Sequence, residues 1–550
     1  MLESREVNAP RPPGAVPEVI EPAAPAAAAP SAAPRHASRH RSPIAIAIAI
    51  AAACWIALAG WAVASPAGAS PDDDYHLAMI YCNAGAADCT TLGHRLGTCF
   101  GMKPTVAADC AAGFRDRTIP STTGVRAGHY PPLFYAAMTP FVGDTIGATT
   151  LNIRLVNVTL AVAAAALSVA LSSRKLRPAV ALSWLAAVPL GMYFLSSINP
   201  NAWSILAIAA MWGPLLSLLT APRSSGAEWP PAVTRGRTAA RAAFVLVMAF
   251  MALGARSESA LWIPPVVAAV TIFALPWPIG RFWRDRDLLL RLILPVVLVA
   301  MSAVALVLFS GRKAEKLTDA ATQASQDPNY HGWQIVQQTM NSLLGMIGFP
   351  GVPLSGLGTY DVPVPEIAGA AIVVALGGLC LFGIGVMYMR KALAFGGFTV
   401  VTVVAIAFLW SERNWEYFQP RYFLPMLFVF MGLALLPAPP RRAGAEPGRP
   451  VRITPLQLAV VFICFAVANA ASLLSTMLRY LSGVTYQPSR DPLTQVSPII
   501  NPRWLGNAIP EWWLGPVGPA TTWVIASTAF TLALVGLWLL MRRTPAASVD

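Results

Sequence analysis

Long apolar runs recur along this 550-residue chain, and they constrain its fold more than any other feature. A run of about 20 apolar residues crosses the roughly 30 Å hydrocarbon core of a bilayer as one helix. Charged residues make up only 12% of the chain, whereas soluble domains carry about 25%. We therefore expect an all-α integral membrane protein with about twelve crossings. The apolar runs place them at 44–64, 147–172, 179–197, 201–221, 242–255, 259–278, 291–310, 367–389, 393–410, 421–437, 453–476 and 520–541.

The basic residues lie in short clusters between these runs and predict the orientation of the chain. The clusters at 174–177, 223–241 and 281–286 fall on one common side, and short loops rich in Lys and Arg stay in the cytoplasm. We therefore expect a multi-pass protein of the cell membrane, in contact with membrane lipid, with both termini cytoplasmic. Because topology accounts for the net charge of +13, we expect no nucleic-acid partner.

The segments before and after the membrane domain at 43–541 are short. Residues 1–42 are rich in Pro and Ala and are expected to form a disordered cytoplasmic tail, and 542–550 a second one. The alternative is a long signal peptide, since the triplets at 62–64 and 67–69 resemble cleavage sites. The residues that follow lie outside in either case, and the sequence leaves cleavage open.

Most of the water-exposed mass lies in three long outer loops, at about 65–146, 311–366 and 477–519. An even number of cysteines in an oxidising compartment favours disulfides. We expect two disulfides rather than a zinc site, because the spacing lacks close Cys-x-x-Cys pairs. The sequence leaves the three possible pairings open. The four cysteines of the first loop are Cys82, Cys89, Cys99 and Cys110.

An acidic cluster, Asp72, Asp73 and Asp74, follows the first crossing at the level of the lipid headgroups. Charge beside lipid is costly unless it has a function, and three crowded carboxylates cannot all ionise freely. At least one should therefore have a raised pKa or bind a cation, and a divalent metal on Asp72 and Asp73 is one possibility. The alternative is helix capping, which Asp favours at a helix start, and we expect it for Asp74.

Five motifs occur in a characteristic order along the chain. They are Pro71-Asp72-Asp73-x-x-His76, Tyr130-Pro131-Pro132-Leu133-Phe134-Tyr135, Ser196-Ser197-Ile198-Asn199-Pro200-Asn201, Gly345-Met346-Ile347-Gly348 and Pro420-Arg421-Tyr422-Phe423-Leu424-Pro425. From about Trp55 to Met541 the chain resembles a bacterial family of multi-pass membrane proteins of unknown function with a Pro-Asp-Glu-x-x-His signature. That family is similar to the type C glycosyltransferases, and the resemblance implies a bundle of that kind.

The chain departs from the family pattern at three positions. Asp73 replaces the signature glutamate, which keeps the charge but shortens its reach. Asn201 stands where the family has an aspartate, so a role that needs a charge there is in doubt. Pro420 replaces a glycine before Arg421, so that turn is expected to differ.

The resemblance implies transfer of a sugar from a polyprenyl-phosphate donor to an envelope glycan, lipid or protein on the outer face. An acceptor hydroxyl needs a carboxylate base within about 2.6 to 3.2 Å, and Asp72 or Asp73 is the candidate. The leaving phosphate needs a fixed cation, for which Arg421 is the first candidate. The remaining candidates for substrate binding are His76, Tyr130, Tyr422 and Arg256.

Two other functions compete with the glycosyltransferase hypothesis. A transporter or flippase for a lipid-linked envelope precursor would predict charged or broken helices at mid-membrane, and the runs outside 254–258 are nearly free of charge. A non-catalytic envelope assembly protein would tolerate replacement of Asp72 and Asp73. For individual residues the alternatives are local: Arg421 and Tyr422 as interfacial anchors, and Arg256 with Glu258 as a salt bridge.

Overall fold

In the computed structural model of this chain, the regular secondary structure is helical. One isolated bridge, between Leu357 and Val362, is the exception among the described residues. The expected all-α fold is therefore confirmed for this part of the chain. The structure describes 43–70, 72–85, 98–101, 103–118, 130–220, 232–275, 286–324, 332–349, 356–357, 361–411, 419–437, 454–483 and 509–543.

Within the described ranges, nine helices are long and apolar enough to cross a membrane. They are α1 (Pro43–Val63), α6 (Ile146–Leu171), α9 (Pro200–Leu219), α10 (Ala232–Ala255), α13 (Ile293–Ala324), α15 (Glu366–Ile384), α16 (Met389–Ser411), α18 (Pro455–Ser482) and α19 (Pro519–Arg543). Each coincides with one predicted crossing. Nine of the roughly twelve predicted crossings are thus supported within the described ranges. The expected tail at 1–42 lies outside the described residues.

The other three predicted crossings are shorter or broken. The run at 179–197 is divided into α7 (Arg177–Ser183), η3 (Trp184–Ala187) and α8 (Leu190–Leu195). Pro189 separates η3 from α8, because proline has no N–H to donate within a helix. The other two are α11 (Ser259–Ala274) and the pair η5 (Pro420–Phe423) and α17 (Leu424–Ala434), all below membrane-spanning length.

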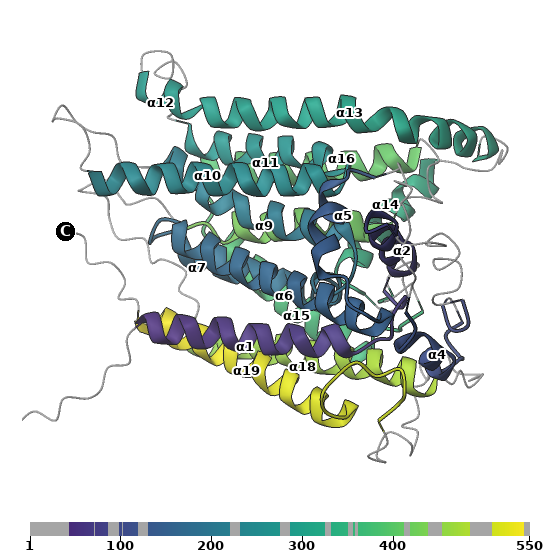
Figure 1. The fold of residues 1–550 in the computed structure, drawn as a ribbon. Coiled ribbons are helices and arrows are strands. Elements are labelled where there is room, and N and C mark those ends of the chain that lie inside the picture. The colour runs from purple at the N-terminus through teal and green to yellow at the C-terminus, as the bar shows by residue number, and fades with distance from the viewer. Residues whose placement is uncertain are drawn as a thin grey trace, which may run out of the picture. The chain divides into compact units, whose positions relative to one another are not determined.

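Short helices occupy the stretches expected to be outer loops. They are α2 (Asp73–Asn83), η1 (Ala108–Ala111), α4 (Ala112–Arg115), α5 (Leu133–Met138), η2 (Thr139–Phe141) and α14 (Gly332–Met346). Figure 1 shows the labelled members α2, α4, α5 and α14 together at the right-hand ends of the long helices. At the left-hand ends, α12 (Arg286–Arg291) precedes α13 (Figure 1). The expected loops 65–146 and 311–366 are therefore partly helical.

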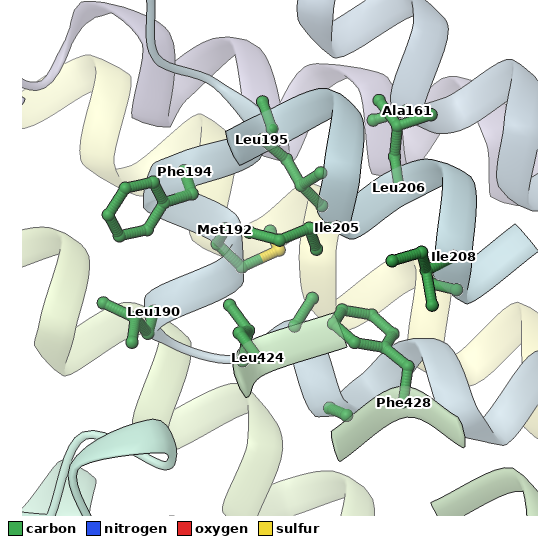
Figure 2. Packing of buried hydrophobic residues seen from close by; sticks show 14 of the residues in the cluster. Ala161, Leu190, Met192, Phe194, Leu195, Ile205, Leu206, Ile208, Leu424 and Phe428 are labelled. Carbon is green, nitrogen blue, oxygen red and sulfur yellow. The ribbon is translucent and has the colours of Figure 1, made fainter. Parts of the chain in front are cut away.

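The core is built around α9, in which every residue is buried. Neighbouring helices α6, α10, α11 and α17 pack against it, and α1 pairs with α19. Figure 2 shows Met192 of α8 and Ile205 of α9 in one apolar cluster with Leu424 of α17. A side chain at Gly432 of α17 would collide with the ring of Trp212, so glycine allows α17 and α9 to approach closely.

One buried arginine of α18 anchors the segment that follows α2. Arg479 donates to the carbonyl oxygens of Phe100 at 2.7 Å and Val106 at 2.6 Å, and to the Asp361 carboxylate at 2.6 Å. A disulfide joins Cys99 to Cys110 in the same segment. Cys82 is also disulfide-bonded, and Cys89, the fourth cysteine of the first loop, lies outside the described residues. The disulfides expected from the cysteine count are thus present at three of the four positions.

Candidate functional site

Asp72 precedes α2 in a backbone conformation that is rare for a residue with a side chain. Its φ of 57° and ψ of 13° lie in the left-handed region, and among the described residues other than glycine it alone has a positive φ. Asp tolerates this region better than most residues, at a cost of about 1 to 2 kcal/mol. Such strain concentrates at functional sites, where the surrounding structure holds it in place.

The carboxylate of Asp72 does not cap the helix that it precedes. It accepts a hydrogen bond of 2.9 Å from Nη2 of Arg421, which lies in η5, and thereby forms an ion pair. The Asp72 side chain remains 41% exposed, while that of Arg421 is 3% exposed. Burial raises the pKa of Asp72, but the positive charges of Arg421 and Arg256 lower it by more. The pKa of Asp72 therefore lies below its ordinary value. Asp72 is thus an accessible, ionised carboxylate.

Asp73 faces the interior and is fully buried. Its Oδ2 accepts from Nη2 of Arg154 at 2.9 Å and from the Gly68 amide at 3.1 Å, and its Oδ1 from the Ile198 amide at 3.1 Å. Arg154 also donates to the carbonyl oxygen of Ala62 at 2.9 Å and to those of Ser65 and Pro66. The role of Asp73 as a base stays a prediction, and these contacts favour a positioning role.

Asp74 also has a perturbed carboxyl group. Burial, followed by the negative charges of Asp73 and Asp72, raises its pKa to about 6. The pKa values of Asp72 and Asp74 are therefore shifted in opposite directions, because Asp72 has an arginine partner, whereas burial and like charge raise the pKa of Asp74.

His76 lies one turn into α2 and is fully buried. Its Nδ1 is 2.9 Å from the hydroxyl of Tyr135 in α5. Its Nε2 has no hydrogen-bond partner within the described part of the chain. Burial, with the positive charges of Arg256 and Arg421, lowers the pKa of His76 to about 3, although Asp72 acts in the opposite direction. The ring is therefore neutral at physiological pH and has one nitrogen available for a ligand.

Arg256 lies at the junction of α10 and α11 and is 1% exposed. Its guanidinium carbon is 5.1 Å from the ring centre of Tyr130 and 5.3 Å from that of Tyr422. Its Nε is 3.5 Å from Oε2 of Glu258. In the described ranges, Nη1 of Arg256 donates no hydrogen bond, so this buried cation retains donor capacity.

Aromatic rings enclose both cations. The guanidinium carbon of Arg421 is 5.4 Å from the ring centre of Phe194 in α8 and 5.6 Å from that of Tyr422. The Tyr130 ring lies 5.3 Å from His76 and 5.7 Å from Tyr75. The first, second and fifth sequence motifs thus meet at one place, which we call the Asp72 site: Asp72, His76, Tyr130, Arg256, Arg421 and Tyr422.

The third motif contacts the start of α2 through Asp73, which accepts from the Ile198 amide. The side chain of Asn199 caps α9 by accepting from the Asn201 amide at 2.9 Å. Asn201, which replaces the family aspartate, is 5% exposed. These contacts give the motif a structural role beside the Asp72 site.

The two candidate metal ligands do not converge on one point. The Asp72 carboxylate pairs with Arg421, and that of Asp73 with Arg154. In the part of the chain that the structure describes, no group of three or more His, Cys, Asp and Glu side chains could hold a metal ion. Within the described ranges, Asp72 and Asp73 therefore share no third ligand of these types for a divalent cation.

Sequence reasoning missed two residues that shape this site. Arg154 lies within the apolar run 147–172, where a charge needs a buried partner, and that position was its signal. Tyr135 ends the second motif, and its contact with His76 depends on how α5 packs against α2. The second motif thus supplies both Tyr130 and Tyr135 to this part of the structure.

The chain was compared with protein-family models, and most of its length matches a family of predicted membrane proteins. The model described as "Predicted membrane protein (DUF2142)" matches residues 55–430. The chain belongs to the DUF2142 family. The DUF2142 match includes all six residues of the Asp72 site and ends before α18 and α19, whereas the sequence resemblance was expected to continue to Met541. No curated protein and no solved structure matched the chain.

Proposed function

We propose that this DUF2142 protein is a glycosyltransferase that moves a sugar from a polyprenyl-phosphate donor to a hydroxyl of a cell-envelope acceptor on the outer face. Asp72 acts as the base. The observation that supports this function is the pairing of a half-exposed carboxylate with a buried arginine, beside a second buried arginine. A base and cations for a phosphate leaving group are the two requirements of such a transfer.

The reaction assigns each group a step. The acceptor oxygen attacks the anomeric carbon of the sugar and transfers its proton to the Asp72 carboxylate. The bond between the anomeric carbon and the phosphate oxygen breaks, and polyprenyl phosphate leaves with the electron pair. Arg421 and Arg256 stabilise the charge that develops on this phosphate, because fixed buried cations need little reorganisation as the charge forms.

The ion pair between Asp72 and Arg421 suggests an order of events. While Arg421 is paired with Asp72, it lowers the pKa of that carboxyl and makes it a weak base. A donor phosphate that binds Arg421 competes for the same guanidinium and weakens its contact with Asp72. The pKa of Asp72 then rises, and the carboxylate becomes a stronger base once the donor is bound.

The aromatic rings hold the cations in fixed orientations. Tyr130 and Tyr422 flank Arg256, and Phe194 lies under Arg421. A stacked guanidinium keeps its plane and presents its N–H groups in a fixed fork, which suits recognition of phosphate. His76, neutral and hydrogen-bonded to Tyr135, adds a further polar contact for the substrate.

The test is sugar transfer or release from labelled polyprenyl-phosphate sugars by purified full-length protein in lipid. We expect Asp72→Asn to abolish turnover while the protein stays folded and inserted in the membrane. Asp116→Asn is the matched control, since its side chain is 88% exposed and lies outside the Asp72 site. Envelope function that survives Asp72→Asn, with no turnover on a broad donor and acceptor panel, would instead favour transport or assembly.

A further inference from the structure

Three arginines surround the last turn of α6, and we call them the arginine cluster: Arg177, Arg237 and Arg241. Arg241 donates from Nε to the carbonyl oxygen of Leu171 at 2.7 Å. Arg177 and Arg237 both donate from Nη2 to the carbonyl oxygen of Ala170, at 3.0 and 3.2 Å. The cluster joins α7 and α10 to the end of α6.

The charge of this cluster is not balanced by the groups that it contacts. A helix C-terminus carries about half a negative charge, whereas three guanidiniums bring three positive ones. Among the described residues, none of the three forms an ion pair with a carboxylate. Burial, with the positive charges of Arg237 and Arg174, lowers the pKa of Arg177. An excess of about two and a half positive charges therefore remains.

The cluster lies far from the Asp72 site along the same helices. Arg154, which holds Asp73, precedes Leu171 by 17 residues of α6, and that distance is about 25 Å at the rise of an α-helix. Arg237 and Arg241 lie in the N-terminal part of α10, whose other end leads to Arg256. Since a hydrocarbon core is about 30 Å thick, the cluster lies at the opposite membrane interface.

We propose that the arginine cluster binds the phosphate of an anionic phospholipid headgroup. Arg237 is exposed and can turn N–H groups towards a ligand, whereas Arg241 is buried and fixes the cluster on the helix end. Leu167, one turn before Ala170 on α6, is 49% exposed and offers an apolar surface to an acyl chain. Basic pockets between helices at an interface bind anionic lipid headgroups, and this adjacent apolar surface favours a lipid over a soluble phosphate.

The experiment measures binding of phosphatidylglycerol to the full-length protein in neutral detergent micelles, where no charged membrane surface contributes. Native mass spectrometry compares phosphatidylglycerol with phosphatidylcholine. We expect preferential retention of phosphatidylglycerol and about fivefold weaker binding in Arg237→Gln, since a basic residue contributes about that factor near anionic lipid. Lys175→Gln is the matched control, because it removes one exposed charge beside the cluster without removing any of its hydrogen bonds.

Three results would overturn the proposal. They are equal retention of the two lipids, equal losses in Arg237→Gln and Lys175→Gln, and displacement of phosphatidylglycerol by glycerol 3-phosphate at similar concentrations. The last would assign the cluster to a soluble anion. Since Arg237 is exposed, its replacement should leave the fold intact, and thermal unfolding of each variant checks this before lipid is added.

Discussion

Arg154 and Asp73 form a fully buried ion pair, with 2.9 Å between Nη2 and Oδ2, that ties α6 to the first turn of α2. The preceding residue, Asp72, is half-exposed and pairs with Arg421 instead. Two adjacent carboxylates thus face different partners in opposite environments. The buried one suits a structural role and the accessible one suits chemistry.

The first prediction separates these two roles by substitution. Asp73→Asn leaves the buried charge of Arg154 without its counter-ion, and loss of one partner of a buried pair costs roughly 3 to 5 kcal/mol. We expect a clear drop in the unfolding temperature for Asp73→Asn and a small one for Asp72→Asn. Thermal unfolding in the same detergent, with turnover measured in parallel, checks this.

The control for that comparison is Asp116→Asn, because this carboxylate is 88% exposed and its contact with Arg115 is as long as 3.9 Å. Its unfolding temperature should match that of the wild type. A folded and stable Asp73→Asn protein without turnover would contradict the separation, since it would give Asp73 a direct part in the reaction.

The second prediction concerns the stacked cation. Arg256→Lys keeps the positive charge but loses the planar group between Tyr130 and Tyr422. Because lysine is a flexible point charge, we expect a raised KM for the lipid-phosphate donor, by about tenfold if roughly 1.4 kcal/mol of binding is lost. The KM for the acceptor should change little. A variant with unchanged donor KM would show that charge alone is sufficient.

The third prediction uses the raised pKa of Asp74, which burial and the charges of Asp73 and Asp72 shift to about 6 from a usual value near 3.8. The folded state therefore binds this proton more tightly than the unfolded state. The resulting stability is fully present below about pH 3.8 and is lost as the pH rises through about 6.

Asp74→Asn is neutral at every pH and removes this dependence. We expect its unfolding temperature to exceed that of the wild type at pH 8, and the difference to shrink as the pH falls to 5. The measurement compares the unfolding temperatures of the two proteins at each pH, because the pH dependence that His76 contributes is common to both. Parallel pH profiles would contradict a raised pKa at Asp74.

The apolar runs predicted most of the helices because a membrane span leaves a clear signal in composition. Hydropathy does not report where helical hydrogen bonding stops, however. Helix α18 continues past the expected end at 476 to Ser482 and carries Arg479 with it. Conversely, the run 179–197 carries no charged residue but is broken at Pro189, so its composition alone suggested one crossing.

The motifs identified every residue of the Asp72 site except Arg256, yet they could not predict their pairing. Asp72 and Arg421 are 349 residues apart, and no local pattern relates them. The division of roles between Asp72 and Asp73 depends on which carboxylate faces α6, which the left-handed backbone at Asp72 determines together with the packing of α2. The sequence alone does not distinguish Asp72 from Asp73 as the candidate base, because both follow the same apolar run.

The last prediction tests the orientation on which the proposed function rests. The basic clusters predict that the Asp72 site faces outwards and that Lys175, beside the arginine cluster, faces the cytoplasm. In intact cells, a membrane-impermeant maleimide should label Asp116→Cys and leave Lys175→Cys unlabelled until the cells are opened.

Both positions are exposed, and Asp116 lies in the segment that Arg479 and the Cys99–Cys110 disulfide anchor near the Asp72 end. The wild type is the control, since its free cysteines Cys54, Cys380 and Cys464 lie within apolar helices. Labelling of Lys175→Cys alone would reverse the orientation, place the Asp72 site on the cytoplasmic side and remove the basis for an outward-facing transfer.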